Sequence, residues 1–115
     1  MATDPLTEAE KLAQVPGIVY VDGPVGRRAR VAGSGLDVWE VISAWLGLDR
    51  RAGAVQESYP WLTLVQIKAA IRFYTLFPEE IDRRLARERE IDRIVEEAGG
   101  MSLELLYRLT DGRDP

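Results

Sequence analysis

The chain has 115 residues, of which 46% are hydrophobic and 30% are charged, and it carries a net charge of −4. This length and composition predict one folded domain with a modest core and exclude disorder throughout. The sequence contains no cysteine and no histidine, which excludes disulfides, zinc fingers, thiol nucleophiles and histidine general bases. We therefore expect neither enzyme activity nor a cofactor or metal.

The expected location follows from hydropathy. No apolar run approaches the roughly 20 residues that a membrane helix requires. The N-terminus is acidic and has no signal-peptide core. We therefore expect a cytoplasmic protein that makes no use of a membrane.

Charge is distributed unevenly along the chain. Residues 27–74 hold seven cations and four anions, a net of +3, so the flanks must sum to −7 to give the total of −4. This contrast indicates either a nucleic-acid surface beside a segment for another partner, or ordinary scatter, and the sequence leaves both open.

The N-terminal residues predict an arm and a hairpin. Residues 1–16 are polar and acidic, and we expect a loosely attached arm with a short helical possibility at residues 7–14. Two β-prone stretches, 18–22 and 28–31, flank a Gly-Pro turn signal and predict a small β-hairpin. Three cations of this hairpin are candidates either for phosphate contacts or for a solvated turn: Arg27, Arg28 and Arg30.

A glycine-rich stretch, Gly33-Ser34-Gly35, stands between the hairpin and the first strong helix signal. A strand, a G-x-G pair and a helix in this order would suit phosphate binding. The fingerprint is incomplete, because Val38 takes the place of its third glycine and no lysine follows in Walker fashion. We interpret the stretch as a flexible turn.

Two helices are predicted next. Asp37 can cap an amphipathic helix over residues 38–46, which Gly47 ends as a glycine after a C-terminus would. Asp49 can cap a second helix that ends at Ser58. Two tryptophans lie off the apolar stripes and are either partner contacts or partly buried side chains: Trp39 and Trp61.

The stretch Tyr59–Tyr74 carries the largest number of independent signals. Thr63 and Gln66 have the spacing of a capping box, so a helix is predicted to begin at Thr63, with Leu62 and Ile67 placed for a hydrophobic staple. The predicted core face comprises Leu64, Ile67, Ala70, Ile71 and Tyr74. The predicted outer face carries Gln66, Lys68 and Arg72. A capped helix after a tight turn and another helix is typical of a helix-turn-helix.

The C-terminal third predicts a long charged helix from Pro78 to Ala98 and a last short amphipathic segment at residues 101–109. That segment needs a surface to cover, on the same chain or on another. The candidate partner-binding residues are Leu103, Leu106, Tyr107, Arg108 and Arg113.

From Ile18 to about Tyr74 the chain resembles the bacterial family called domain of unknown function 433. The family's Y-P-x-L-T motif region is matched by Tyr59, Pro60, Leu62, Thr63, Ile67, Ala69, Ala70 and Tyr74. Its earlier glycine-rich motif is matched only by Gly26, Val31, Gly33, Leu36 and Val38. Ser34-Gly35 replaces the family's Thr-Arg pair and Ala29 replaces its proline, so any role of that arginine is not carried over.

The resemblance implies a mainly α fold with a homeodomain-like three-helix helix-turn-helix core. In this interpretation an arm of residues 1–16 precedes a domain at 17–77, which includes the small N-terminal β-hairpin. A C-terminal helical extension at 78–115 serves dimerisation or partner binding.

Some members of the family resemble VapB-type antitoxins, whose toxin is a PIN-like ribonuclease. The resemblance therefore implies a homodimeric antitoxin of a type II toxin-antitoxin pair, which binds operator DNA and, through its C-terminal helices, the toxin. Arg108 or Arg113 would enter the carboxylate-lined metal site of the toxin. The residues expected to contact DNA are Arg27, Arg28, Arg30, Gln66, Lys68 and Arg72.

A second interpretation stays open. The predicted recognition helix carries only two cations, Lys68 and Arg72, which is a thin electrostatic footprint for DNA. The chain would then be a protein-interaction or dimerisation module that does not bind DNA.

Overall fold

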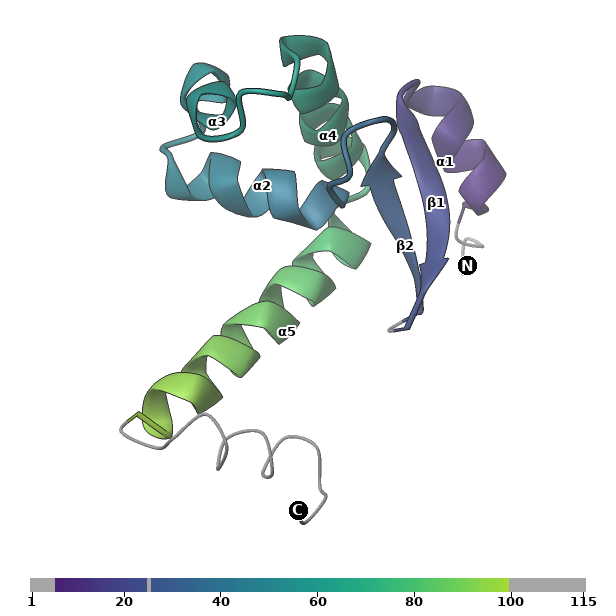
Figure 1. Cartoon of the computed structure of the whole chain (residues 1–115). Helices are drawn as coiled ribbons and strands as arrows, with labels where there is room; N and C mark the ends of the chain where they lie inside the picture. Colours follow the sequence, from purple (N-terminus) through teal and green to yellow (C-terminus); the bar gives the residue numbers. More distant parts are fainter. Residues whose placement is uncertain (1–5, 25, 100–115) are drawn as a thin grey trace. The chain divides into compact units, whose positions relative to one another are not determined.

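The computed structural model describes residues 6–24 and 26–99. Over these residues the protein is mainly helical, with a small antiparallel β-hairpin near the N-terminus, as predicted (Figure 1). The elements in chain order are α1 (Glu8–Gln14), β1 (Ile18–Gly23), β2 (Gly26–Val31), α2 (Val38–Gly47), α3 (Ala52–Ser58), α4 (Leu64–Leu76) and α5 (Pro78–Glu97). The chain divides into two compact units, the first ending at Asp82 and the second beginning at Arg83.

Helix α1 is a packed element of the first unit. Thr7 and Glu10 form a capping box at its N-terminus, so the helical possibility in this stretch is realised. The helix contacts β1, and Val15, which follows it, is fully buried. No residue of α1 itself is buried, so Val15, together with the contacts to β1, holds this segment to the first unit.

The hairpin pairs β1 with β2 in an antiparallel register that runs from Ile18 opposite Val31 to Gly23 opposite Gly26. Successive side chains of a strand point to opposite faces, so one face of the hairpin can be buried while the other meets water. The buried side chains are Ile18, Ala29 and Val31. Strand β2 contacts α2 and α4, and β1 contacts α1 and α4.

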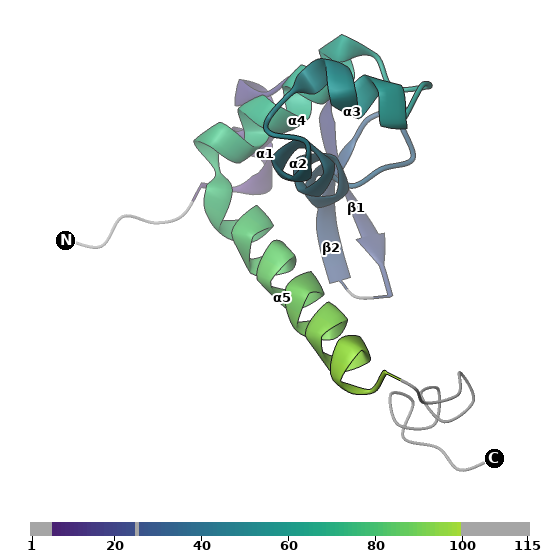
Figure 2. The same ribbon diagram turned by 90° about the vertical axis from the view of Figure 1, so that its left-hand side faces the viewer.

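Helices α2, α3 and α4 contact one another in every pairing. Figure 2 shows α2 nearly end-on, with α3 and α4 beside it. Because these helices and the hairpin converge, the core forms between them. Its largest fully buried side chains are Phe73, Ile42, Leu62, Ile67, Val15, Val31, Val38, Val41 and Val55.

The connection between α2 and α3 differs from the prediction. Gly47 is the last residue of α2 rather than the residue after its end, and Leu48 is the C-cap. Asp49 and Arg50 have φ angles of 57° and 58°, the left-handed region that aspartate tolerates better than most residues. Asp49 therefore makes the turn, and Arg51 rather than Asp49 is the N-cap of α3.

Helix α4 begins where the sequence predicts. The Thr63 hydroxyl accepts a hydrogen bond from the backbone N–H of Gln66 at 3.1 Å, and the Gln66 side chain accepts one from the N–H of Thr63 at 3.0 Å. This reciprocal capping box satisfies two backbone donors that the helix itself cannot satisfy. Leu62 and Ile67, the two residues expected to form the staple, are both buried.

The buried face of α4 is rotated from the predicted one. Ile67 and Ala70 are buried as expected, but Phe73 is also fully buried and Leu64 is 41% exposed. The rings of Tyr20 and Phe77 pack edge-on to the Phe73 ring, with centroids 6.3 and 5.4 Å away. Because an aromatic side chain buries more area than a leucine, packing of Phe73 sets the rotation and leaves Leu64 at the surface.

A polar cluster ties three segments of the first unit together. The Tyr20 hydroxyl donates to Glu80 Oε1 at 2.6 Å, and Lys11 Nζ donates to the same oxygen at 2.8 Å. Lys11 belongs to α1, Tyr20 to β1 and Glu80 to the first turn of α5. Burial, followed by the hydrogen bond to Glu80, raises the pKa of Tyr20.

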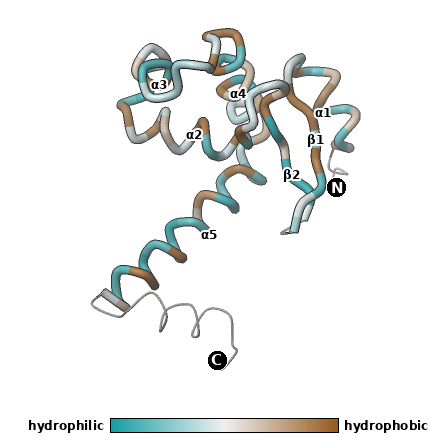
Figure 3. Tube along the Cα trace, in the orientation of Figure 1, coloured by the Kyte–Doolittle hydropathy of each residue, from teal (hydrophilic) through white to brown (hydrophobic). Residues whose placement is uncertain are grey.

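The second unit contains the rest of α5. Its charged residues form intrahelical ion pairs, Arg84 with Glu88 and Arg93 with Glu90 and Glu97. Figure 3 shows a mainly hydrophilic helix interrupted by separate hydrophobic positions. An exposed pair of this kind at i, i+4 stabilises an isolated helix by about 0.3 to 0.5 kcal/mol.

Substituting Phe73→Ala tests whether this ring is central to the core. We expect the free energy of unfolding to fall by about 3–5 kcal/mol, because a large cavity forms between α4 and its neighbours. Urea unfolding followed by circular dichroism measures it. The matched control on the same helix is Val65→Ala, at a side chain that is 77% exposed, where a change of about 0.5 kcal/mol or less is expected.

Stability should also depend on alkaline pH through Tyr20. The folded state holds the phenol proton above the pH at which the unfolded chain loses it, because the folded-state pKa is raised. This contribution is complete below the ordinary tyrosine value of about 10 and is lost as pH rises beyond it. Urea unfolding across that range should show a shallower decline for Tyr20→Phe than for the wild type. If the stability of the wild type and of Tyr20→Phe declined equally with pH, the prediction would be wrong.

Candidate binding surface on helix α4

Of the six side chains predicted to contact DNA, five have partners inside the first unit. Arg27 pairs with two carboxylates, Glu8 at 2.7 Å and Asp22 at 3.0 Å, and the hydrogen bond that Arg27 donates to Glu8 contributes most to raising the pKa of Arg27. These groups are exposed, so the pairs are individually weak. They nevertheless reduce the positive field that a phosphate would meet at this hairpin.

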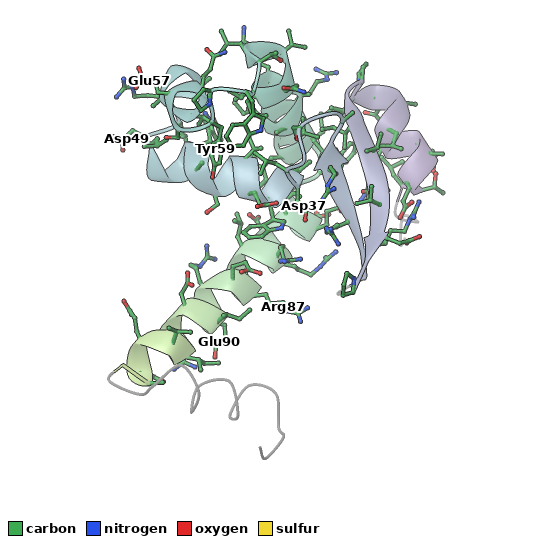
Figure 4. The ribbon with its side chains drawn as sticks, in the orientation of Figure 1. Asp37, Asp49, Glu57, Tyr59, Arg87 and Glu90 are labelled. Carbon is green, nitrogen blue, oxygen red and sulfur yellow. The ribbon has the colours of Figure 1, made fainter. Side chains whose placement is uncertain are left out.

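Arg28 and Arg30 converge on a single buried carboxylate. Arg28 Nε lies 2.6 Å from Asp37 Oδ2, and Arg30 Nε lies 3.1 Å from Asp37 Oδ1. The indole N–H of Trp39 donates to Asp37 Oδ2 at 3.3 Å. Figure 4 shows Asp37 at the start of α2, next to β2. The two arginines therefore join the hairpin to α2. Their positive charges are partly neutralised by a carboxylate that is only 4% exposed.

Gln66 and Arg72 also make internal hydrogen bonds. The Gln66 amide donates through Nε2 to the carbonyl of Ala32 at 3.1 Å, while its oxygen is used in the capping box. Arg72 Nε donates to the carbonyl of Gln14, the last residue of α1, at 3.1 Å. Both side chains hold α4 against neighbouring segments, which limits their use for reading bases.

The Gly33-Ser34-Gly35 stretch forms a turn, as predicted, and the Ser34 hydroxyl makes hydrogen bonds within it. The Ser34 hydroxyl donates to the carbonyl of Val31 at 2.7 Å and accepts from the N–H of Leu36 at 2.9 Å. Gly33 and Gly35 have φ angles of 74° and 75°, a conformation that glycine adopts without strain. The turn thereby presents carbonyl groups to the start of α4.

Lys68 differs from the other five. It is exposed, and in the described part of the chain it makes no hydrogen bond or ion pair. Helix α4 carries no acidic residue at all. The predicted outer face of α4 is thus reduced to one cation that is available to a partner.

The exposed start of α4 is instead apolar. Trp61 is 60% exposed, Leu64 is 41% exposed and Val65 is 77% exposed; these three residues are called the α4 patch. The indole N–H of Trp61 donates to the carbonyl of Ser34 at 3.2 Å, and its ring packs edge-on to Tyr59 with centroids 5.4 Å apart. A large apolar side chain is therefore held in place while most of it faces water.

The α4 patch was only partly visible in the sequence. Trp61 lies off the apolar stripe, which left partner contact and partial burial open. The helical pattern predicts Leu64 in the core and makes no prediction for Val65. The available signal is that Val65 stands outside the i, i+3, i+4 pattern of the core while being apolar.

The five candidate partner-binding residues are not among the residues that the structure describes. They are Leu103, Leu106, Tyr107, Arg108 and Arg113. Between residues 6 and 99, apart from residue 25, no three or more acidic residues gather in a way that could hold a metal ion. No helix in this range has the length and apolar character needed to cross a membrane.

The chain matches no protein-family model, no curated protein and no solved structure. The resemblance to domain of unknown function 433 and to VapB-type antitoxins therefore stays a prediction.

Replacing Asp37 with asparagine tests whether the buried carboxylate holds the hairpin on α2. We expect Asp37→Asn to lower the free energy of unfolding by about 2 kcal/mol, because Arg28 and Arg30 lose a charged acceptor. Thermal and urea unfolding measure the change. The matched control is Asp22→Asn, whose side chain is 83% exposed and pairs with Arg27; we expect it to cost less than about 1 kcal/mol. Equal effects would show that burial of Asp37 is unimportant.

Proposed function

We propose that this chain is a protein-interaction module that binds its partner through the α4 patch. The observation that carries the proposal is the exposure of three apolar side chains within five residues around the start of one capped helix: Trp61, Leu64 and Val65. Exposed apolar side chains that gather at one place mark interaction sites more often than scattered ones do.

Immobilisation of Trp61 supports the proposal. Its N–H already has an acceptor in Ser34, so burial of the ring by a partner leaves no polar group unsatisfied. Tryptophans that are held in place before binding lose little conformational freedom and are frequent among the residues that dominate interface energies. Val65 and Leu64 would surround that anchor with apolar area.

The charge distribution also favours protein over DNA. Five of the six candidate DNA contacts have intramolecular partners, and the sixth, Lys68, stands alone beside an apolar patch. A DNA-binding face needs several uncompensated cations, because counterion release supplies most of its affinity. A single lysine one helical turn from exposed apolar side chains is a composition more typical of a protein interface.

A second candidate function is the operator-binding antitoxin with a homeodomain-like core. It is favoured by the order of α3, a short connection at residues 59–63 and the capped α4, all packed with α2, which is the order of a helix-turn-helix. Residues 50–76 also hold four cations and one anion. Here α4 would enter the major groove and residues 78–115 would bind a second subunit or a PIN-like toxin.

Substituting Val65→Glu tests the first proposal. We expect that a protein which co-purifies with the tagged wild-type chain from its native cells no longer co-purifies with V65E. The reason is that burial of the new carboxylate in an apolar contact, with no cation to pair with it, is unfavourable. The binding constant for that protein should weaken by tenfold or more, about 1.4 kcal/mol. Val19→Glu places the same change at another exposed valine, on β1, and should bind normally. Equal binding by wild type and V65E would refute the role of the patch.

The DNA alternative has a separate measurement. A gel-shift against the chain's own upstream region, repeated at several salt concentrations, should show no specific complex if the first proposal is right. A complex that weakens steeply with salt and is lost on Arg51→Ala and Lys68→Ala would establish the second candidate instead.

A further inference from the structure

Within residues 6–24 and 26–99, two segments expose apolar side chains in clusters. The first is the α4 patch. The second is formed by Ile91, Ile94 and Val95 on α5, which are 45%, 47% and 50% exposed; these three residues are called the α5 stripe. Residues three and four apart share one face of a helix, so the stripe is continuous.

The surroundings of these two surfaces carry opposite charge. Helix α4 has two cations, Lys68 and Arg72, and no anion, which gives +2. Residues 86–97 of α5 have three cations and five anions, which gives −2. The ion pairs of Arg93 with Glu90 and Glu97 are solvent-exposed and can rearrange at little cost.

The local neighbours of each surface show the same contrast. On α4 the charged residue one turn from Leu64 and Val65 is Lys68. On α5 the positions one turn from the stripe hold four carboxylates and one guanidinium, and Figure 4 shows two of these residues, Arg87 and Glu90. The acidic ones are Glu88, Glu90, Asp92 and Glu97, which together are called the acidic rim. Glu88 pairs with Arg84, and Glu90 and Glu97 pair with Arg93, so these arginines offset part of the negative charge of the rim. Residues 84–97 hold four cations and five anions, which leaves an acidic excess of one.

Charge therefore selects between the possible pairings of these surfaces. Two α4 patches facing each other would bring two Lys68 ammonium groups together. Two α5 stripes facing each other would juxtapose two acidic rims. Like charges across an interface are unfavourable, whereas a stripe on a patch joins apolar with apolar and acid with base.

We infer that the protein self-associates by docking the α5 stripe of one molecule on the α4 patch of a second copy. The inference rests on the proposed function and names the partner of the same surface. Ile91, Ile94 and Val95 pack on Trp61, Leu64 and Val65, and Lys68 pairs with the acidic rim of the stripe. The contact is a helix face laid on an apolar surface, and it is heterologous because it joins two different surfaces.

Mixing two variants tests this inference directly. Val65→Glu disables the patch and leaves the stripe intact, while Ile94→Glu disables the stripe and leaves the patch intact. Each variant alone should associate at least tenfold more weakly than the wild type. An equimolar mixture should associate more strongly than either alone, because the V65E stripe can dock on the I94E patch. Sedimentation equilibrium of the full chain over a range of concentrations measures all of these.

Both substitutions are at exposed positions, so the fold should persist, and circular dichroism checks this. Val19→Glu is the matched control and should associate like the wild type, since Val19 belongs to neither surface. A wild-type chain that is monomeric at every concentration overturns the inference. So does a mixture that associates no better than its parts, or a variant pair in which only one substitution has an effect.

The failure of this inference is distinguishable from failure of the proposed function. If the wild type is monomeric but V65E loses a different co-purifying protein, the α4 patch binds that protein and self-association is wrong. If V65E changes neither mass nor co-purification, the patch is not a binding surface and both proposals fall.

Discussion

The ion pairs at Asp37 are the constraint on which the arrangement of the first unit depends. One nearly buried carboxylate accepts from Arg28 and Arg30 of β2 and from the indole of Trp39, while the same residue stands at the N-cap of α2. A two-stranded hairpin is marginal alone, so its attachment to α2 decides whether it persists. The turn that follows β2 then presents its carbonyl groups to Trp61 and Gln66 at the start of α4.

This attachment has a consequence for function. Several cations that the sequence suggests for a partner are bound within the first unit instead. Arg28 and Arg30 pair with Asp37, and Arg27 pairs with Glu8 and Asp22. Arg72 donates a hydrogen bond to a backbone carbonyl. Charge that neutralises a neighbour contributes little to a long-range field. The side chains left exposed on α4 are instead largely apolar, which favours a protein surface over a phosphate backbone as the partner.

Much of the fold could be predicted from local sequence. The capping boxes, the Gly-Pro turn between two β-prone stretches and the proline at the start of the last helix are short-range signals whose partners lie within four residues. The hairpin, α2, α4 and α5 follow from them. The antitoxin and operator-binding interpretations came from a family resemblance, and they stay predictions because the described contacts do not test them.

What the sequence by itself determined is where α2, α4 and α5 begin and which residue types are available for chemistry, since both depend on neighbours along the chain. Tertiary structure alone decided which charges are free and which apolar residues are exposed. Phe73 rotated the buried face of α4 and exposed Leu64, and Arg28 and Arg30 met Asp37 only because β2 folds back against α2. A side chain's partner in space depends on packing between distant segments, and helical periodicity carries no information about that packing.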